Sequence, residues 1–233
     1  MNKKTNDNDS CLNCGFIPFC SIEETYPEWS PKNNVVVKQQ ISLKKKHVLH
    51  FRQTAFKSLY VIQSGGLKTF EVDNEGNELI RGFYFAGEIL GLEAIASGTY
   101  LFTAMALTNT VLCEVPYNHF IELLNCNTRL QKQILCLTSK QLTANFYLNY
   151  LTAEQRFACF LIDLFNRLHV NTQCMEFLLP MSRQDIGNYL RLSGESVSRL
   201  FTRFKEKKII AIDHKKIQII DLDQLKQISA LVN

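Results

Sequence analysis

The sequence predicts an α+β protein in which an N-terminal β jelly roll is joined by a long helix to a C-terminal winged helix-turn-helix. Three observations lead to this prediction. Short apolar runs broken by turn residues fill residues 32–116, where seven of the ten glycines lie between positions 65 and 98. After Pro116 the apolar spacing becomes helical. Residues 182–202 have the pattern of two short helices joined by a tight turn.

The composition is that of an ordinary globular protein. Of 233 residues, 46% are hydrophobic and 21% are charged, which excludes disordered and collagen-like classes. No apolar run approaches the ~18 to 20 residues that a membrane span needs. The polar first ten residues lack the apolar stretch of a secretory signal. We therefore expect a cytoplasmic protein with no membrane partner, whose cysteines stay reduced.

Residues 1–31 are predicted to be a polar arm that carries three closely spaced cysteines. These are Cys11, Cys14 and Cys20, in a segment that Gly15 and Pro18 make loop-like. A short loop can wrap three thiolates around one soft metal centre, which is how both zinc and iron–sulfur clusters are held. The spacing does not separate these two metals. Cysteines gathered by chance in a tail are the third alternative.

The remaining cysteines have other settings. Cys126, Cys136 and Cys159 stand among leucines and phenylalanines with no second cysteine at ligand spacing, so we expect small buried side chains. Cys174 lies in a polar connector and is uninformative. In the arm, Cys11-Leu-Asn-Cys14 also matches the C-x-x-C of a redox enzyme, but no βαβ pattern surrounds it.

The jelly roll is expected over residues 32–116, because many short strands with regular turns are typical of that fold. A hairpin turn is predicted at Asp73-Asn-Glu-Gly76. The dimerisation helix is expected over residues 117–150. An a/d seam with alternating spacings of four and three residues runs along it and ends one residue beyond, at Leu130, Ile134, Leu137, Gln141, Ala144, Leu148 and Leu151. Such a short seam fits either a homodimer or a helix packed on its own jelly roll.

Residues 151–233 contain the predicted DNA-binding domain. Thr152 and Gln155 form a capping box at the start of one helix. Ser182 and Ser193 are suited to cap the two helices of the helix-turn-helix motif, at about 182–202. Apolar runs at 209–212 and 217–220 predict a hairpin wing behind the motif.

The outer face of the second helix has the chemistry to read bases in the major groove. Arg199 can donate two hydrogen bonds to guanine, Glu195 can accept one from cytosine N4, and Ser198 can contact a base edge or a thymine methyl group. Ser196 and Arg203 share this face. The set predicts sequence-specific contact with double-stranded DNA.

Other basic residues near this motif are better suited to phosphates. Arg183 and the Lys205-Glu-Lys-Lys208 run can position the protein on DNA without reading its sequence. Between positions 183 and 216 there are nine Lys or Arg and four Asp or Glu, an excess of five positive charges. The whole chain carries only +4, so its positive field is concentrated here.

These segments resemble the Crp/Fnr family of transcription regulators. The resemblance rests on Met181-Ser-Arg-Gln-Asp-Ile-Gly-Asn-Tyr-Leu190 and Glu195-Ser-Val-Ser-Arg-Leu200-Phe, and on the order of jelly roll, long helix and winged helix. The sequence resembles the oxygen-sensing branch of this family at three segments: Ser64-Gly65-Gly66, Phe85-Ala-Gly87-Glu88-Ile-Leu-Gly91 and Cys113-Glu-Val-Pro116. The resemblance implies a DNA-binding regulator with a cyclic-nucleotide-binding-like jelly roll, and no enzyme. Arg191 departs from the family, which usually has Gly there.

The resemblance also supplies a fourth ligand. It implies that Cys113 joins Cys11, Cys14 and Cys20 in binding a 4Fe–4S cluster. In such regulators the cluster promotes homodimerisation, and oxygen converts or destroys it. The implied function is therefore an oxygen-responsive, anaerobic transcription activator. A regulator of the same fold with zinc or with bare redox thiols is the alternative.

Further implications concern partners. The resemblance implies a palindromic DNA site with TTGAT half-sites, read by Glu195, Ser198 and Arg199, and contact with RNA polymerase. Family members that bind cyclic nucleotides hold the phosphate with an Arg-Ser pair. Here the matching segment, Gly98-Thr-Tyr-Leu-Phe-Thr-Ala104, contains no arginine. A buried phosphate would lack a cationic partner, so we expect no cyclic nucleotide.

Overall fold

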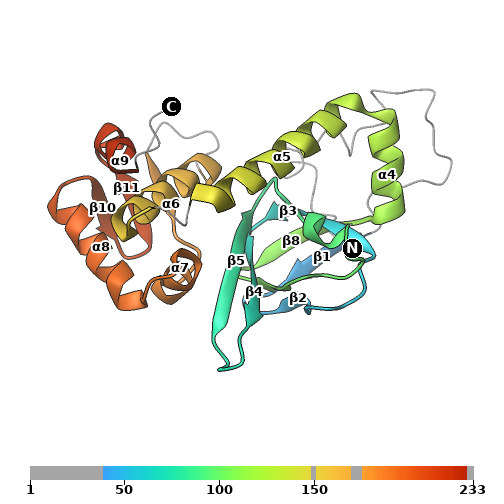
Figure 1. Ribbon diagram of the computed structural model, residues 1–233, viewed down its shortest axis with the longest axis horizontal. Coiled ribbons are helices and arrows are strands. Elements are labelled where there is room, and N and C mark those ends of the chain that lie inside the picture. The colour runs from blue at the N-terminus through green and yellow to red at the C-terminus, as the bar shows by residue number, and fades with distance from the viewer. Residues whose placement is uncertain (1–38, 148–150, 169–174, 230–233) are drawn as a thin grey trace, which may run out of the picture. The chain divides into compact units, whose positions relative to one another are not determined.

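The computed structural model describes residues 39–147, 151–168 and 175–229 (Figure 1). The arm with Cys11, Cys14 and Cys20 lies outside the described residues, and so does Cys174. The chain divides into two compact units between Leu135 and Cys136, with Val72–Ile80 counted in the second unit. Among the described helices, none is long and apolar enough to span a bilayer.

Two four-stranded sheets form the first unit and confirm the jelly roll (Figure 1). One sheet has the order β1-β8-β3-β6, with bounds Gln39–Leu43, Thr110–Pro116, Ser58–Ser64 and Ile89–Leu90. The other has the order β2-β7-β4-β5, with bounds Val48–His50, Thr103–Ala106, Gly66–Val72 and Glu78–Phe85. A short 3₁₀ helix, η1, spans Leu92–Ala94.

Side chains from both sheets share one apolar core. Ile62 and Leu112 come from the first sheet, Leu67 and Ala104 from the second, and all four are fully buried. The predicted turn between β4 and β5 is also present. There the Asp73 carboxylate accepts the N–H groups of Glu75 and Asn77 at 2.9 and 2.8 Å. Gly76 has φ +85°, a conformation that a side chain disfavours.

Two helices follow the last jelly-roll strand, where a single helix over residues 117–150 was expected. They are α4, Tyr117–Cys126, and α5, Thr128–Tyr147. Asn127 separates them because its backbone is extended, with φ −132° and ψ 93°. Its side chain accepts the N–H of Leu130 at 3.0 Å. An asparagine is favoured at such a cap, so it ends one helix and starts the next.

The first part of the predicted seam packs on its own jelly roll. Leu130 is 1% exposed and, with Ile134, joins an apolar cluster that includes Leu59, Val115 and Phe120. Packing within one chain therefore accounts for these two seam positions. The side chains of Gln141 and Ala144, like Leu148 as a whole, lie outside what the structure describes. The homodimer thus stays a prediction.

The expectation that Cys126 and Cys136 are buried is wrong. Both side chains are exposed, and Cys159 is half-buried. Cys126 is the last residue of α4. Cys136 lies six positions after Leu130, about 240° further around the helix, and therefore away from the side that packs on the jelly roll. Position on the helix, and not the apolar neighbours in the sequence, decides the exposure of these thiols.

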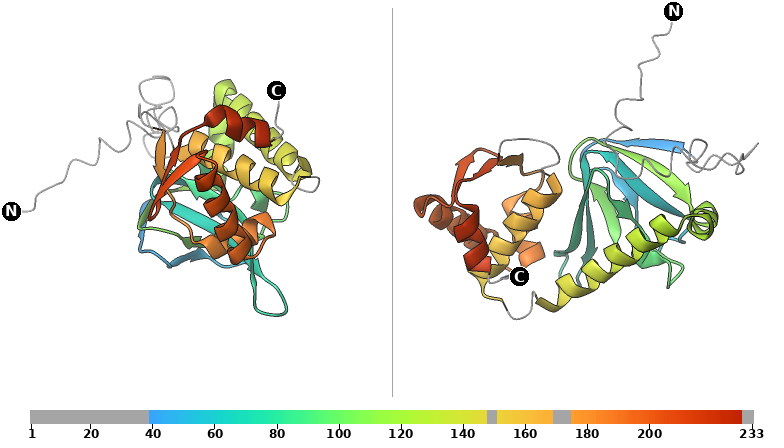
Figure 2. Two further views of the ribbon diagram at one scale, coloured as in Figure 1. Left: turned by 90° about the vertical axis from the view of Figure 1, so that its left-hand side faces the viewer. Right: turned by 90° about the horizontal axis from the view of Figure 1, so that it is seen from above.

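Besides Val72–Ile80 and the part of α5 from Cys136 onward, the second unit contains four described helices and a three-stranded sheet (Figure 2). The helices are α6, Ala153–Leu168; α7, Arg183–Leu190; α8, Gly194–Glu206; and α9, Leu222–Ser229. The sheet has the order β10-β11-β9, with bounds Ile210–Asp213, Lys216–Ile219 and Glu176–Leu178. The hairpin wing is confirmed by the pairing of β10 with β11. Strand β9 and helix α9 were not anticipated.

Helix α6 forms the centre of this unit. Its predicted capping box is present, because the Thr152 N–H donates to Gln155 Oε1 at 2.9 Å and the Gln155 N–H donates to Thr152 Oγ1 at 3.3 Å. Phe157 is fully buried and meets the rings of Phe201 and Phe204 edge-on, with centroids 4.6 and 5.2 Å away. Aromatic packing therefore fixes α8 on α6.

Candidate functional site

The helix-turn-helix is built from α7 and α8, each capped by the serine that the sequence predicted. The Ser182 Oγ atom accepts the Asp185 N–H at 3.0 Å, and Asp185 Oδ2 accepts the Ser182 N–H at 3.0 Å, which completes a capping box. Ser193 Oγ accepts the Ser196 N–H at 3.0 Å. These local bonds begin each helix at the position that the motif requires.

The turn between the two helices depends on Gly187 and Arg191. A Cβ atom at Gly187 would lie 2.6 Å from the Leu192 carbonyl oxygen and 3.1 Å from the Gly194 nitrogen. Both are backbone atoms, so the turn can approach α7 only where no side chain intervenes. Arg191 ends α7 in the left-handed conformation, with φ 57°. Glycine is usual at that position of a helix end, but here an arginine adopts the left-handed conformation.

The structure brings four of the predicted DNA-contacting side chains to the exposed face of α8. Val197, Leu200, Phe201 and Phe204 form its buried stripe. Glu195, Ser198, Arg199 and Arg203 are exposed, and Ser196 is half-buried. The Ser198 hydroxyl donates to the Gly194 carbonyl at 2.9 Å. The predicted base-reading groups therefore share one helix surface, as a major-groove reader requires.

Arg183, predicted to contact phosphate, lies in a different environment. Its guanidinium carbon is 3.1 Å from the centroid of the Phe201 ring. Burial lowers the pKa of Arg183 to about 10, so the group stays charged at neutral pH. The Nη1 atom is buried and has no hydrogen-bond partner among the described residues. This arginine packs α7 on α8, and its contact with DNA stays a prediction.

Sequence reasoning missed the carboxylate of Glu154. It lies in the first turn of α6, where the sequence indicated only a capping box. The Lys207 Nζ atom donates to Glu154 Oε1 at 3.0 Å, and Arg203 Nη1 lies 3.6 Å from Glu154 Oε2. Two cations at the C-terminal end of α8 thus share one acid. These residues are about fifty positions apart in the chain, so no local sequence pattern could have revealed the contact.

In the first unit, Cys113 lies on β8 and is half-buried. Strand β8 runs between β1 and β3, and Cys113 is opposite Gln40 on one side and Val61 on the other. Its side chain packs against the same apolar cluster as Leu130 and Ile134. Within the described ranges no three metal-binding side chains come together, and the other three proposed ligands lie outside those ranges.

The neighbouring Glu114 attaches the start of β1 to β8. Its carboxylate is buried and accepts hydrogen bonds from Ser58 Oγ at 2.8 Å and from Gln39 Nε2 at 2.7 Å. Gln39 is the first residue of β1. Gln39, the first described residue, is therefore held beside the strand that carries Cys113.

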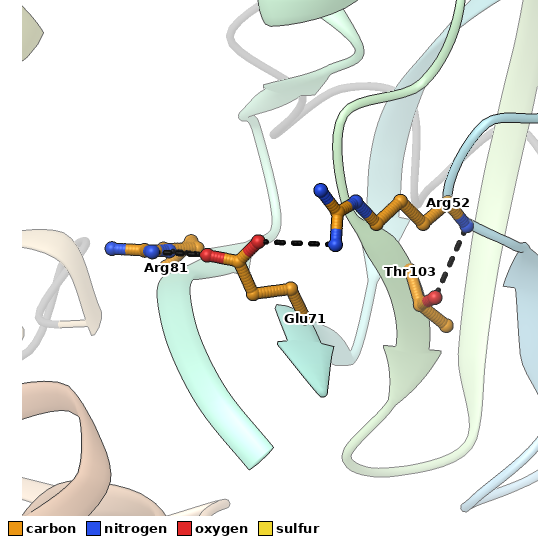
Figure 3. Close-up of polar contacts among 4 residues, drawn as sticks. All are labelled: Arg52, Glu71, Arg81 and Thr103. Carbon is orange, nitrogen blue, oxygen red and sulfur yellow. Dashed lines mark hydrogen bonds and ion pairs between the residues drawn. The ribbon is translucent and has the colours of Figure 1, made fainter. Parts of the chain in front are cut away.

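Both arginines of residues 39–116 pair with Glu71 (Figure 3). Arg81 Nε donates to Glu71 Oε1 at 2.8 Å, and Arg52 Nη1 lies 3.4 Å from Glu71 Oε2. The Arg52 backbone N–H also donates to Thr103 Oγ1 at 3.1 Å. A phosphate entering this unit would have to compete with a carboxylate that already holds both guanidinium groups.

Comparison with known proteins matches the two units separately. Residues 40–127 match the cyclic nucleotide-binding domain, and residues 155–228 match the Crp-like helix-turn-helix domain. The transcriptional activator protein Anr of Pseudomonas aeruginosa is 34% identical over 220 residues, covering 92% of this chain and 90% of the relative. The fumarate and nitrate reduction regulatory protein of Escherichia coli K12 is 32% identical over 228 residues, covering 94% and 90%.

A solved structure supports the same architecture. FixK2 from Bradyrhizobium japonicum superposes with a TM-score of 0.74 and covers 84% of this chain and 98% of its own. Its sequence identity is 24%, so this likeness concerns the fold alone.

Proposed function

Since the chain belongs to the Crp/Fnr family of transcription regulators, we propose that it activates transcription in the absence of oxygen and is inactivated by oxygen. The chain is a DNA-binding regulator and not an enzyme. The relatives support the finer statement through their names, a transcriptional activator and a fumarate and nitrate reduction regulator. They cover nine-tenths of this chain.

The exposed face of α8 is the observation that supports the DNA-binding part of this proposal. In this proposal Arg199 would donate two hydrogen bonds to guanine, Glu195 would accept one from cytosine N4, and Ser198 would contact an adjacent base. The proposed target is a TTGAT half-site, and a two-fold palindrome would be read by a homodimer, with one α8 in each half-site. Arg203 and the basic end of α8 would hold phosphates.

The oxygen response is proposed to depend on Cys11, Cys14, Cys20 and Cys113. Four thiolates are the usual ligands of a 4Fe–4S cluster, and a bound cluster would supply chemistry that oxygen can attack. The partly exposed thiol of Cys113 fits this donor set, and β1, which begins at Gln39, pairs with the strand that carries Cys113. Ligation would tie the arm to β8 and add folding free energy there.

The apolar contacts of Cys113 indicate how ligation reaches the dimer helix. Cys113 and Leu130 pack against one cluster, and Ile134 lies one turn further along α5. Closely packed interiors transmit small displacements, so ordering at Cys113 would bias α5 and the homodimer it forms. The activated dimer would contact RNA polymerase. No cyclic nucleotide is proposed as ligand, because residues 98–104 contain no arginine that could pair with its phosphate.

Anaerobic purification tests the proposal. We expect a brown protein with about four iron and four sulfide atoms per chain, which binds a TTGAT palindrome as a dimer and loses colour and DNA binding in air. Cys113→Ala should abolish both. Cys126→Ala is the matched control, because Cys126 is an exposed cysteine outside the ligand set, and it should keep both.

Two outcomes would favour the alternatives. A colourless protein that contains zinc, or one whose DNA binding responds to thiol oxidants without any metal, would replace the cluster with zinc or bare thiols. Equal DNA binding with and without air, also after Cys113→Ala, would exclude the oxygen switch and leave DNA binding intact.

A further inference from the structure

The first turn of α6 is attached to both helices of the helix-turn-helix. The Glu154 carboxylate lies 3.0 Å from Lys207 Nζ and 3.6 Å from Arg203 Nη1. Arg203 is in the C-terminal half of α8, and Lys207 follows directly after that helix. Arg156 Nη1 donates to the carbonyl of Leu190, at the end of α7, at 2.7 Å. The contacts of Glu154 use the side-chain charges of Arg203 and Lys207, whereas the bond of Arg156 is to a backbone carbonyl and involves neither of these two cations.

The pairs of Glu154 contribute little to folding. The Glu154 side chain is 29% exposed, and those of Lys207 and Arg203 are 46% and 56% exposed. Exposed pairs of this kind stabilise a protein by less than about 1 kcal/mol. Their effect on the local electrostatic field is more important than their effect on stability. The negative charge of Glu154 cancels one of the positive charges that the end of α8 would present to phosphate.

DNA phosphates and the Glu154 carboxylate would compete for the same two cations, Arg203 and Lys207. Binding to DNA is driven largely by cations that neutralise phosphates and release counterions. Arg203 lies on the exposed face of α8, and Lys207 follows directly after the helix. To bind a phosphate, each cation must leave the Glu154 carboxylate or divide its hydrogen bonds between the carboxylate and the phosphate. Glu154 therefore opposes phosphate binding by Arg203 and Lys207.

We propose that Glu154 is an affinity-lowering residue, an internal competitor that holds Arg203 and Lys207 away from DNA phosphates. This inference rests on DNA binding by α8 and adds a determinant that lies outside the helix-turn-helix itself. The competition is independent of base sequence, because phosphate contacts carry no base information. Glu154 therefore sets how tightly the protein holds any duplex and leaves its preference among duplexes unchanged.

Glu154→Gln tests the proposal, because the amide keeps the size of the side chain and removes its charge. Dissociation constants are measured by fluorescence anisotropy with the full, anaerobically purified chain, for a TTGAT palindrome and for an unrelated duplex, across a salt series. We expect both to be bound roughly 3- to 10-fold more tightly at low salt. We also expect the slope of log K against log salt to steepen by up to about two per chain.

Glu206→Gln is the matched control. It removes the same charge from the last residue of α8, but among the described residues the Glu206 carboxylate forms no ion pair with Arg203 or Lys207. A general charge effect would change affinity equally in the two variants. Equal changes, or a weaker affinity of Glu154→Gln than of the wild type, would overturn the proposal.

Two further variants separate competition from a change in folding. In an Arg203→Gln, Lys207→Gln background, the gain from Glu154→Gln should disappear, and a persisting gain contradicts the mechanism. Glu154→Asp keeps the charge but shortens the reach, and should give an intermediate affinity at an unchanged melting temperature. If the wild type binds no duplex, DNA binding itself fails; if it binds and Glu154→Gln does not tighten it, only this inference fails.

Discussion

Arg199 and Glu195 lie one turn apart on α8, and the Arg199 Nη2 atom is 2.6 Å from Glu195 Oε1. Their side chains are 77% and 74% exposed, and a pair of this kind on a helix is worth only about 0.3–0.5 kcal/mol. The two proposed base-reading side chains therefore form a weak, solvent-exposed pair with each other. Separating this pair would cost little, so the proposed base contacts of both side chains remain accessible.

Arg199→Lys should weaken specific DNA binding without changing stability. Lysine keeps the charge but cannot form the two-pronged bond to guanine, so we expect a loss of about 1–3 kcal/mol on a TTGAT palindrome. Binding to an unrelated duplex should change little. Competition assays with both duplexes measure the difference. Lys205→Gln, a phosphate-type change, should weaken both equally; equal losses for Arg199→Lys would remove it from base reading.

Gly187→Ala should disrupt the helix-turn-helix. The added Cβ atom would meet the Leu192 carbonyl and the Gly194 nitrogen, which are backbone atoms that cannot swing away. We expect destabilisation by about 1–3 kcal/mol, as for overpacking, and a loss of DNA affinity. Urea unfolding and DNA titration measure the two effects. Asn188→Ala, next to it on α7, should keep both close to wild type. Normal stability of Gly187→Ala would show that the turn has room.

His50 should make the stability of the jelly roll depend on pH. It is 6% exposed and stacks on Tyr100 with ring centroids 3.7 Å apart, and burial lowers its pKa to about 4. The unfolded chain, with a pKa near 6.5, takes up the proton first as the pH falls. Stability is therefore complete above about pH 6.5 and declines toward pH 4, by roughly 3 kcal/mol from this residue.

Urea unfolding at pH 7 and pH 4.5 measures this effect. His50→Phe keeps an aromatic ring beside Tyr100 and should remove this part of the pH dependence. His214, which is 97% exposed, provides the control, and His214→Gln should leave the pH dependence as it is. The same decline in His50→Phe and wild type would assign the acid sensitivity to other groups.

Leu130→Ala should loosen α5 from the jelly roll. Its side chain is fully buried in the cluster that Cys113 also contacts, so we expect a loss of about 2–5 kcal/mol in unfolding free energy. In the anaerobic protein the link from Cys113 to the homodimer should weaken as well. Analytical ultracentrifugation and urea unfolding test both. Leu135→Ala, at an exposed site, should leave unfolding unchanged; an unaltered dimer in Leu130→Ala would move the coupling elsewhere.

Much of the DNA-binding unit could be predicted from the sequence because its determinants are local. The caps at Ser182 and Ser193 act on N–H groups three residues away, and the stripe of Val197, Leu200, Phe201 and Phe204 follows the period of the helix. Glycine and turn residues likewise predicted the jelly roll. Interactions within one or two helical turns depend on residues that are close together in the sequence. The fold class and the exposed face of α8 therefore follow from the sequence itself.

Only the tertiary structure decided which distant groups meet. The apolar neighbours of Cys136 predicted burial, but α5 turns another face to the jelly roll and leaves this thiol exposed. Arg183 has the charge of a phosphate ligand, yet it lies on the Phe201 ring. Glu154 and Lys207 are 53 residues apart and bond only because α8 packs on α6. Such contacts depend on how whole elements pack, and no short stretch of sequence specifies that packing.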